Sequence, residues 1–343
     1  MALFPKVGRE QPRLRVAWRF LIFFLCLGVL LHLFPFYYMI ATSFTPANEA
    51  LALPPRLWPR EPTVAAWQLI FDVVTANSSN AAVRNLMQYP FYVYFRNSLF
   101  ITFMTLALSL PVTSLAAYAN SKLQRGIIAR WSFLFFIGTL MVPFAVTLIP
   151  SFLLTRQFPF ALPNAPMIPG TSTPFPTIRI WDTPWAIIIP GVFSAFNFLL
   201  FKGFFDTIPD SIIQAARVDG GSEFNIFRRI VFPMSIPVYA VAAWLQFGAT
   251  WDNFLWPLVV MQSPEKIPTS VAIYKIMDLL TRQGATNADQ ALGQAQAMKE
   301  VLAAGLSWNG LMVLGLLQTL PIFLMFIICR EYLMRGIRIR GFK

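Results

Sequence analysis

Six long runs of apolar residues limit what this chain can fold into more than any other feature of its sequence. A helix needs about 20 mostly apolar residues to cross the hydrocarbon core of a bilayer. Six segments have this character: Val16–Thr42, Ser98–Asn120, Trp131–Leu154, Pro184–Phe205, Pro233–Val260 and Gly310–Cys329. Only 12% of the 343 residues are charged, about half the share of a typical soluble domain. The sequence therefore predicts an all-α integral membrane protein with six transmembrane helices, and it excludes a soluble or disordered chain.

The first apolar run follows several basic residues, as a secretory signal peptide would. The apolar part of a signal peptide is only about 7–15 residues long, whereas this run continues through Phe36 to Met39. We therefore expect an uncleaved transmembrane helix.

The formal net charge of +12 would suggest a nucleic-acid partner in a soluble protein. Here the basic residues gather in the N-terminal tail, in the segments after the second and fourth runs, and in the C-terminal tail. Cytoplasmic segments of membrane proteins carry an excess of Lys and Arg. The charge pattern therefore predicts a multi-pass membrane protein with both termini in the cytoplasm (N-in, C-in) and no nucleic acid.

We expect one transmembrane domain over residues 1–343. Its predicted parts outside the membrane are cytoplasmic tails at 1–15 and 330–343, outer loops at about 43–97, 155–183 and 261–309, and a cytoplasmic loop at about 202–232. Outer loops of this length are expected to dock a partner, although the Pro-rich 155–183 is also compatible with a plain linker. A Gln/Ala-rich insertion near 281–304 indicates a helix outside the membrane over Ala285–Ala304.

The cytoplasmic loop lies between the fourth and fifth runs, and its sequence predicts a helix, a glycine break and a second helix. Asp210 or Ser211 is expected to cap the first helix, Gly220 and Gly221 to end it, and Ser222 or Asp219 to start the second. Apolar residues on this water-facing loop indicate a surface for a partner protein. They are Ile212, Ile213, Ala216, Phe224 and Phe227.

This loop resembles the cytoplasmic signature of inner-membrane permease subunits of binding-protein-dependent ABC importers. That signature is Glu-Ala-Ala, three residues, Gly, nine residues, Ile, one residue and Leu-Pro. Ala215 and Ala216 match it, Gly220 follows at the right distance, and Ile230 and Pro233 complete the spacing. Two positions differ: Gln214 stands in place of Glu and loses its charge, and Phe232 stands in place of Leu.

The resemblance extends over nearly the whole chain. It includes Asn97–Leu99, Met141–Pro143, Phe201–Phe205, Trp251–Pro257 and Arg330–Gly336, which are similar to the carbohydrate-uptake branch and to the smaller, six-helix permease of maltose-type importers. The longer outer loops are the main departure.

The resemblance implies a set of partners: a second homologous permease, two copies of a cytoplasmic ATPase and an extracytoplasmic solute-binding protein. The ATPase subunits would bind and hydrolyse ATP, so the chain itself is expected to have no cofactor, metal or enzymatic activity. It also lacks a Gly-x-x-x-x-Gly-Lys-Ser/Thr run. The residues implied to couple to the ATPase are Gln214, Ala215, Ala216, Asp219, Gly220, Ile230 and Pro233.

Polar residues within or next to the apolar runs are costly in lipid, and they usually face the bundle interior or a water-filled path. The candidates for the substrate path are Asn197, Gln246, Asp252, Asn253 and Gln318. Hydrogen bonds between helices are the alternative role for each of them. The single histidine, His32, is expected to be a packed or interfacial residue, and Cys26 and Cys329 form no metal-ligand pattern.

The function predicted from the sequence is half of the translocation path of an ATP-driven importer for a sugar or oligosaccharide. The alternatives are the same machinery importing another solute, such as a glycerol-phosphate, or a stand-alone secondary transporter, which would leave the cytoplasmic loop unexplained. A membrane enzyme would need acidic, His or Cys groups that converge at membrane depth. The sequence does not identify the sugar.

Overall fold

The computed structural model describes residues 12–50, 52, 56–74, 89–158, 178–281 and 307–335. Secondary structure in these residues consists of helices and one isolated β-bridge between Phe158 and Ile178. The chain divides into two compact units, Met1–Asp72 with Leu280–Leu316, and Val73–Leu279 with Leu317–Lys343. The expected helix at 285–304 and most of the insertion near 281–304 lie outside the described residues.

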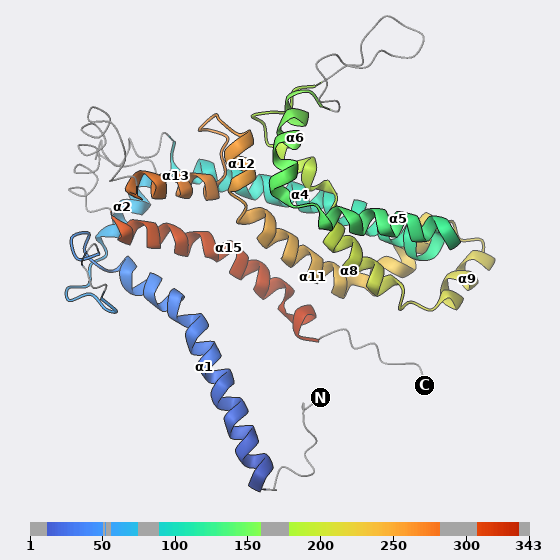
Figure 1. Cartoon of the computed structure of the whole chain (residues 1–343), viewed down its shortest axis with the longest axis horizontal. Helices are drawn as coiled ribbons and strands as arrows, with labels where there is room; N and C mark the ends of the chain where they lie inside the picture. The colour runs from blue at the N-terminus through green and yellow to red at the C-terminus, as the bar shows by residue number, and fades with distance from the viewer. Residues whose placement is uncertain are drawn as a thin grey trace, which may run out of the picture. The chain divides into compact units, whose positions relative to one another are not determined.

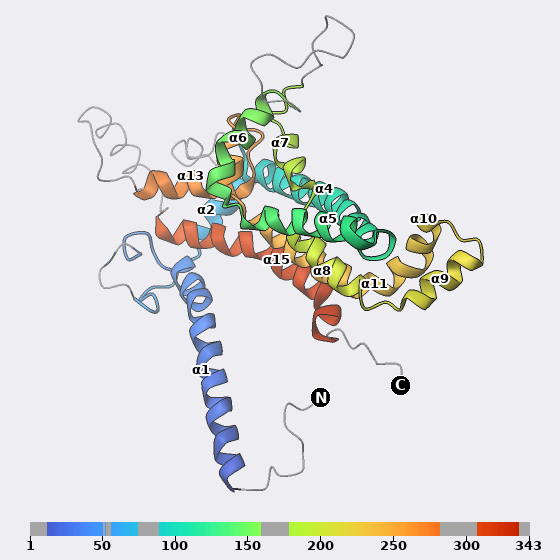
Figure 2. The same cartoon turned by 45° about the vertical axis from the view of Figure 1, so that its right-hand side comes forward.

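The larger unit is a bundle of helices that lie side by side (Figures 1 and 2). Its central members are α4 (Phe91–Tyr118), α5 (Gly126–Gly138), α8 (Ala195–Phe205) and α11 (Phe232–Trp251). Helix α4 packs against both α8 and α11, and it continues through a π-helical turn at Ala119–Leu123.

The core of this bundle is aromatic. Phe198, Phe201 and Phe205 of α8 are fully buried because their three- and four-residue spacing places them on one face of the helix. The Phe201 ring lies 4.6 Å from the ring of Tyr239 on α11, and the Phe205 ring lies 6.3 Å from that of Tyr118 on α4. These contacts join three helices that are far apart in sequence.

The second half of α15 (Trp308–Arg335) packs on α11 in the same unit. The indole nitrogen of Trp251 donates a 2.9 Å hydrogen bond to the carbonyl of Gln318, and the rings of Trp244 and Phe326 lie 6.1 Å apart.

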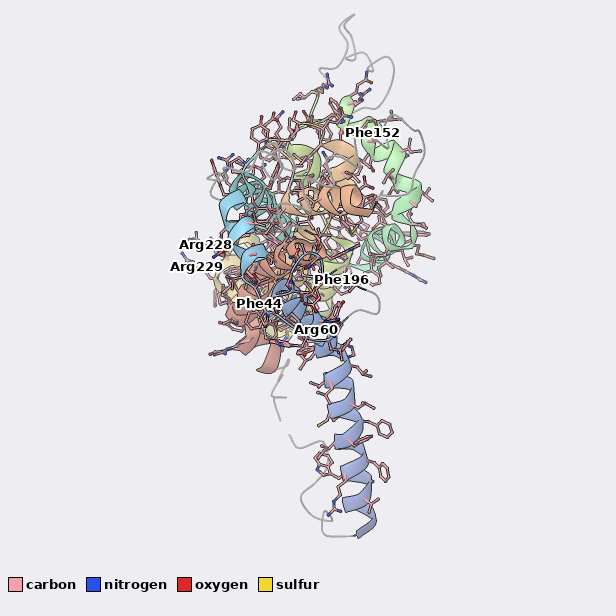
Figure 3. All side chains as sticks on the ribbon, turned by 90° about the vertical axis from the view of Figure 1, so that its left-hand side faces the viewer. Phe44, Arg60, Phe152, Phe196, Arg228 and Arg229 are labelled. Carbon is pink, nitrogen blue, oxygen red and sulfur yellow. The ribbon has the colours of Figure 1, made fainter. Side chains whose placement is uncertain are left out.

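The smaller unit contains α1 (Pro12–Ser43), α2 (Ala65–Val74) and the start of α15. The indole of Trp67 on α2 donates to the hydroxyl of Ser43, and Asn309 donates to the carbonyl of Thr45 at 3.0 Å. The most apolar stretch of α1 is not buried within the chain, and its side chains project on all sides of the helix (Figure 3). A helix that is apolar all round requires a lipid or protein environment.

Four helical segments among the described residues are long and apolar enough to cross a membrane: Val16–Ser43, Phe91–Leu123, Glu223–Trp251 and Trp308–Leu333. Two bent pairs of helices raise the total to six if each pair is one span. The first, second and sixth predicted runs therefore correspond to single helices.

The third predicted run, Trp131–Leu154, is not one straight helix. It bends by 101° between α5 with its 3-10 extension and α6 (Phe144–Arg156). Pro143 cannot donate a backbone hydrogen bond and disfavours a helical conformation in the residue before it. Val142 is accordingly extended, with ψ at 114°.

The fourth and fifth runs are also interrupted. Helix α7 (Trp185–Ile188) and a 3-10 turn at Pro190–Val192 precede a break, after which Ser194 caps α8 by accepting a hydrogen bond from the backbone of Asn197. Helix α11 ends at Trp251, and α12 (Leu255–Val260) follows. A further helix, α13 (Thr269–Thr281), lies in the predicted third outer loop.

The buried face of α8 provides a test of this packing. Phe198→Ala should lower the unfolding free energy of the purified protein by about 2 kcal/mol or more, because the cavity left behind removes dispersion contacts that lipid does not replace. Phe196, labelled in Figure 3 on the same helix, is 55% exposed. Phe196→Ala should change the thermal unfolding temperature little, and equal losses for the two variants would contradict the assigned core.

Candidate functional site

The predicted cytoplasmic loop forms the helix-glycine-helix arrangement at one end of the bundle (Figures 1 and 2). Helix α9 (Asp210–Val218) is followed by α10 (Glu223–Ile226), and a π-helical turn at Phe227–Val231 continues directly into α11. Ser222 caps α10 by accepting from the backbone of Asn225, as one of the two predicted alternatives.

The capping prediction for the first helix was wrong. Pro209 is the N-cap of α9, and no side chain caps this end. The carboxylate of Asp210 instead accepts a 2.7 Å hydrogen bond from the ammonium group of Lys122. A contact with another part of the chain has replaced a local one.

The glycine pair ends α9 in the way that the sequence indicates. Gly220 has a φ of +79°, a conformation that costs little only for glycine. Its N–H donates to the carbonyl of Arg217, and that of Gly221 donates to the carbonyl of Ala216, which is the Schellman pattern. A Cβ on Gly221 would lie 2.8 Å from the Ala216 oxygen, so this turn needs both glycines.

The apolar residues of the loop divide between the interior and the surface. Ile213 and Phe227 are buried in the core with Tyr118, so the expectation that they form a partner surface was wrong. Val218 is 87% exposed and Phe224 64% exposed. The outward apolar surface is therefore at the end of α9 and the start of α10.

The residues of the signature motif also divide in two. Gln214, Ala215, Asp219 and Gly220 are exposed on α9 and its terminal turn, and Ala216 is half-buried. Ile230 packs against the bundle core, and Pro233 is exposed near the start of α11. The structure thus brings the first part of the motif together on one small surface, while Ile230 fixes the loop to the bundle.

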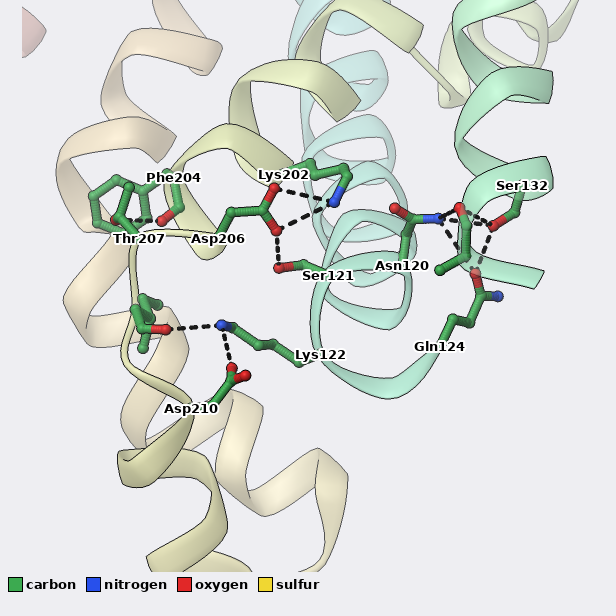
Figure 4. A network of polar contacts seen from close by, with 12 residues as sticks. Asn120, Ser121, Lys122, Gln124, Ser132, Lys202, Phe204, Asp206, Thr207 and Asp210 are labelled. Carbon is green, nitrogen blue, oxygen red and sulfur yellow. Dashed lines mark hydrogen bonds and ion pairs between the residues drawn. The ribbon is translucent and has the colours of Figure 1, made fainter. Parts of the chain in front are cut away.

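A polar network that the sequence did not suggest surrounds the end of α4 (Figure 4). Asn120 donates to the hydroxyl of Ser132 on α5 at 2.7 Å, and Ser121 donates to the carboxylate of Asp206 after α8 at 2.6 Å. Asp206 also pairs with Lys202 at 3.1 Å. The same segment contains Lys122, which pairs with Asp210. In the sequence Lys122 is one of several basic loop residues, and no pattern indicates this partner.

A cavity of about 310 Å³ opens in the same unit, within the size range of small-molecule sites, about 300–1,000 Å³. On α6 and α11 the lining residues recur at helical spacing, so each helix contributes one face, and Ile187, Pro190 and Gly191 of α7 and the following 3-10 turn form a further wall. The lining residues of the two helices are Phe144, Thr147 and Ser151 on α6, and Gln246, Ala249 and Thr250 on α11. Thr105 of α4 and Asn253 and Trp256 around the start of α12 also line it. All of its described lining residues are uncharged.

The five predicted path residues have different surroundings. Gln246 and Asn253 line the cavity. Asn197 is 1% exposed and its amide donates to the Gln246 side-chain oxygen at 2.9 Å. Gln318 bonds the backbone of Trp251 and joins α15 to α11, and Asp252 is exposed and does not line the cavity.

A clamp formed by Asp182 holds the segment that follows α12. Its carboxylate accepts hydrogen bonds from the backbones of Gln262 and Ser263 at 2.8 and 2.9 Å, and Lys266 lies 3.4 Å away. Burial alone would raise the pKa of Asp182, but the hydrogen bonds from Ser263 and Gln262, together with Lys266, lower it to about 2.

Among the described residues, no three His, Cys, Asp or Glu side chains gather in a way that could hold a metal ion. The ring of His32 bonds the carbonyl of Gly28 one turn earlier in α1. Cys26 is exposed and Cys329 is buried, and both are free thiols.

Comparison with known protein families identifies the family of this chain. The model of the binding-protein-dependent transport system inner membrane component matches residues 109–339, a stretch that contains both the α9–α10 loop and all but one of the cavity residues. The chain belongs to this family. It is therefore an inner-membrane permease of an ABC importer, a transport component.

Curated relatives agree with this assignment. The polygalacturonan/rhamnogalacturonan transport system permease YtcP of Bacillus subtilis is 26% identical over 254 residues, 74% of this chain and 76% of its own. The arabinooligosaccharide transport system permease AraQ of Halalkalibacterium halodurans is 26% identical over 311 residues, 90% of this chain and 91% of its own.

A solved structure shares the fold of this permease. It is a bacterial ABC transporter involved in the import of the acidic polysaccharide alginate, with a TM-score of 0.66 and 18% identity. The match covers 94% of this chain and 98% of that one.

The Asp182 clamp should give the permease a defined acid sensitivity. Because the pKa of Asp182 is lowered from 3.8 to about 2, the ionised carboxylate stabilises the folded state fully above about pH 4, and this contribution is lost as the pH falls through about 2. Asp182→Asn should therefore lower the unfolding temperature at pH 7, and the difference from the wild type should vanish towards pH 2.

Differential scanning fluorimetry of the detergent-solubilised protein across this pH range measures the difference. Glu61→Gln, which neutralises an exposed carboxylate, serves as the control and should leave the unfolding temperature unchanged. An Asp182→Asn effect that persisted at pH 2 would contradict the clamp.

Proposed function

We propose that this permease forms half of the translocation path for a sugar or oligosaccharide and couples to a cytoplasmic ATPase through α9. The observation that carries the proposal is the α9–Gly220–α10 turn, which presents an exposed surface at one end of an apolar helix bundle. A second, homologous permease would form the other half of the path. ATP binding and hydrolysis belong to two copies of the ATPase, and this chain needs no cofactor of its own.

The proposed topology has six spans with both termini in the cytoplasm. Helices α5 and α6 count as one span and the stretch from Pro190 to Phe205 as another, whereas α9, which follows that stretch after a bend of 79°, lies outside the membrane. The bend at Pro143 then lies at membrane depth, where irregular backbone is tolerated when it lines a cavity. The orientation in the membrane is supported by basic residues at the end of the bundle that carries α9, because cytoplasmic segments are rich in Lys and Arg. They are Lys122, Arg217, Arg228 and Arg229. Figure 3 shows Arg228 and Arg229 next to each other at the periphery.

The surfaces of the chain suggest where the partners bind. Val218 and Ala215 form a small apolar surface on α9 that would fit a groove on the ATPase. Gln214, which replaces the Glu of the family signature, can still form hydrogen bonds but carries no charge. An extracytoplasmic binding protein would dock on the outer loops, to which the Asp182 clamp belongs. We treat residues 1–343 as one functional transmembrane domain that contains both compact units.

The chemistry of the cavity supports a neutral, hydroxyl-rich solute. The amides of Gln246 and Asn253 and the hydroxyls of Ser151 and Thr250 can each exchange hydrogen bonds with sugar hydroxyls. Asn197 donates to the side-chain oxygen of Gln246, and the Gln246 amide donates one N–H to the hydroxyl of Thr250 at 3.4 Å, which leaves its other N–H as a donor. A glycerol-phosphate would be better matched by an Arg or Lys side chain, and the described cavity lining contains neither.

The ATPase-coupling proposal is tested by expressing the chain with its neighbouring permease and ATPase. The ATPase should co-purify, and Gly220→Val should abolish coupled uptake because a β-branched residue is strained at a φ of +79°. Gly203→Val is the matched control, since Gly203 lies on α8 with open space around it and no positive φ.

Uptake is measured in proteoliposomes after the binding protein has been screened with arabinobiose, lactose, digalacturonate and glycerol 3-phosphate. Failure of the ATPase to co-purify, or full coupled uptake by Gly220→Val, would overturn the coupling role of α9. Selection of glycerol 3-phosphate over the sugars would overturn the proposed solute class, and selection of the charged digalacturonate over arabinobiose and lactose would overturn its neutral character.

The cavity makes a separate prediction. Gln246→Leu should lower the maximal uptake rate of the selected sugar by about tenfold, because a lost hydrogen bond to a buried solute costs about 1–2 kcal/mol. Its KM should change little, since the binding protein delivers the solute. Gln318→Leu, the same chemical change away from the cavity, should leave the rate per assembled complex unchanged. Equal rates for wild type and Gln246→Leu would remove Gln246 from the path.

A further inference from the structure

Helix α9 has only a small apolar anchor of its own. Of its nine residues only Ile213 is buried, and the rest of the helix lies at the edge of the bundle. Ala216 adds a second, half-buried contact with the same core. The polar contacts at both ends of α9 supplement this small apolar anchor.

Both ends of α9 are held by the same segment, the end of α4. At the start of α9, the ammonium group of Lys122 donates to the Asp210 carboxylate at 2.7 Å and to the carbonyl of Ile208 at 2.8 Å. At the other end, Arg217 donates to the backbone carbonyl of Lys122 at 3.4 Å. Lys122 thus contacts both ends of the coupling helix. Its side chain is only 6% exposed, whereas that of Asp210 is 72% exposed, so the ion pair is open to solvent on its acidic side.

A second contact joins α4 to the far side of the glycine turn. The hydroxyl of Tyr118 donates to one carboxylate oxygen of Glu223 at 3.0 Å, and Arg217 donates to the other at 2.6 Å. This ion pair bridges α9 and α10 across Gly220 and Gly221. Tyr118 itself is 3% exposed and lies in the aromatic core.

The four bundle helices whose ends lie near α9 and α10 differ in whether they run unbroken towards the cavity. Helix α4 is unbroken from Phe91 to Leu123, and the helix from Glu223 to Trp251 is also unbroken. Helix α8 stops at Ser194 and α5 stops before Pro143, so both are interrupted before they reach the cavity. Two continuous helices therefore run from the loop to the cavity, where α4 contributes Thr105 and α11 contributes Gln246.

These two helices are attached to α9 by different means. The α10–α11 helix follows α9 through the covalent chain, whereas α4 is joined to α9 by its polar contacts and by the shared core in which Ile213 and Tyr118 are buried. Seventeen residues of helix, about 25 Å, separate Lys122 from Thr105. A small tilt of α4 at the loop end would therefore displace one wall of the cavity.

We propose that Lys122 and Tyr118 are positioning residues that fasten both ends of α9 to α4, so that α4 moves with the coupling helix and carries its motion to the cavity. This inference rests on the proposed role of α9. In this proposal the motion of α9 reaches the cavity through two helices, α4 and the α10–α11 helix that continues from the loop. Lys202, at the same end of the bundle, pairs with Asp206 one turn later and does not contact α9, which makes it a matched control.

The functional test uses the complete importer, with its partner permease, ATPase and binding protein, in proteoliposomes. Lys122→Met keeps the apolar stem and removes the charge. It should lower uptake per ATP hydrolysed by about fivefold or more, while the amount of co-purified ATPase and its basal hydrolysis stay at the wild-type level. Lys122→Arg should recover most of the ratio, and Lys202→Met should not change it.

The structural test measures whether α4 and α9 move together. Spin labels at Ser211→Cys on α9 and Val112→Cys on α4, both exposed positions, are introduced after Cys26→Ser and Cys329→Ser. In the wild-type background the distance from pulsed electron paramagnetic resonance should be the same without nucleotide and with ATP and vanadate. Lys122→Met should shift or broaden the distance distribution on nucleotide binding.

A wild-type distance that changed with nucleotide would overturn the proposal, as would a loss of coupling in Lys122→Met without a change in the distance distribution. If Lys122→Met reduces the amount of assembled complex, Tyr118→Phe decides by the same two measurements, because it removes one hydroxyl from the second contact. Failure of the wild-type ATPase to co-purify, or coupled uptake by Gly220→Val, would instead count against the proposed role of α9. The two failures are therefore distinguishable.

Discussion

The structure depends on one constraint: in an apolar medium every backbone N–H and C=O must find a partner within the protein. Continuous helices meet this requirement by themselves, and α4 and the helix from Glu223 to Trp251 are such elements. Where a helix breaks, other groups supply the missing partners. Ser194, for example, caps α8 with its hydroxyl. The breaks at Pro143 and Ser194 belong to the third and fourth apolar runs, which also contribute to the cavity walls.

The same constraint relates the cavity to the interrupted helices. Helix α6 starts at Phe144, immediately after the bend, and presents Thr147 and Ser151 from the same face. The bend therefore places a polar stripe opposite Gln246 and Thr250 of α11, and the buried amide of Asn197 orients Gln246 from behind. A cavity with hydroxyl and amide walls suits the passage of a hydroxylated solute.

At the other end of the bundle, the loop that contains α9 combines a fixed inner side with an exposed outer side. Ile213 and Phe227 pack into the aromatic core, whereas Val218 and Phe224 face outward. The coupling role proposed for α9 needs both, because a force applied to the outer side is transmitted only if the inner side is held in place. In our proposal the contacts of Lys122 and Tyr118 also fix the orientation of α9. They connect it to α4, a helix that does not adjoin α9 in the sequence.

The sequence by itself determined the helical membrane class, the positions of the first, second and sixth long helices and the glycine turn, because these follow from local length, hydropathy and backbone freedom. It did not determine which side chains of the loop turn inward, since Ile213 and Val218 are both apolar and only the neighbouring Tyr118 and Phe205 decide between them. Nor did it separate Gln246, which lines a cavity, from Gln318, which joins two helices. The tertiary structure alone decided the partners of Lys122, because its contacts join residues about 90 positions apart, and no local pattern records a distance of that kind.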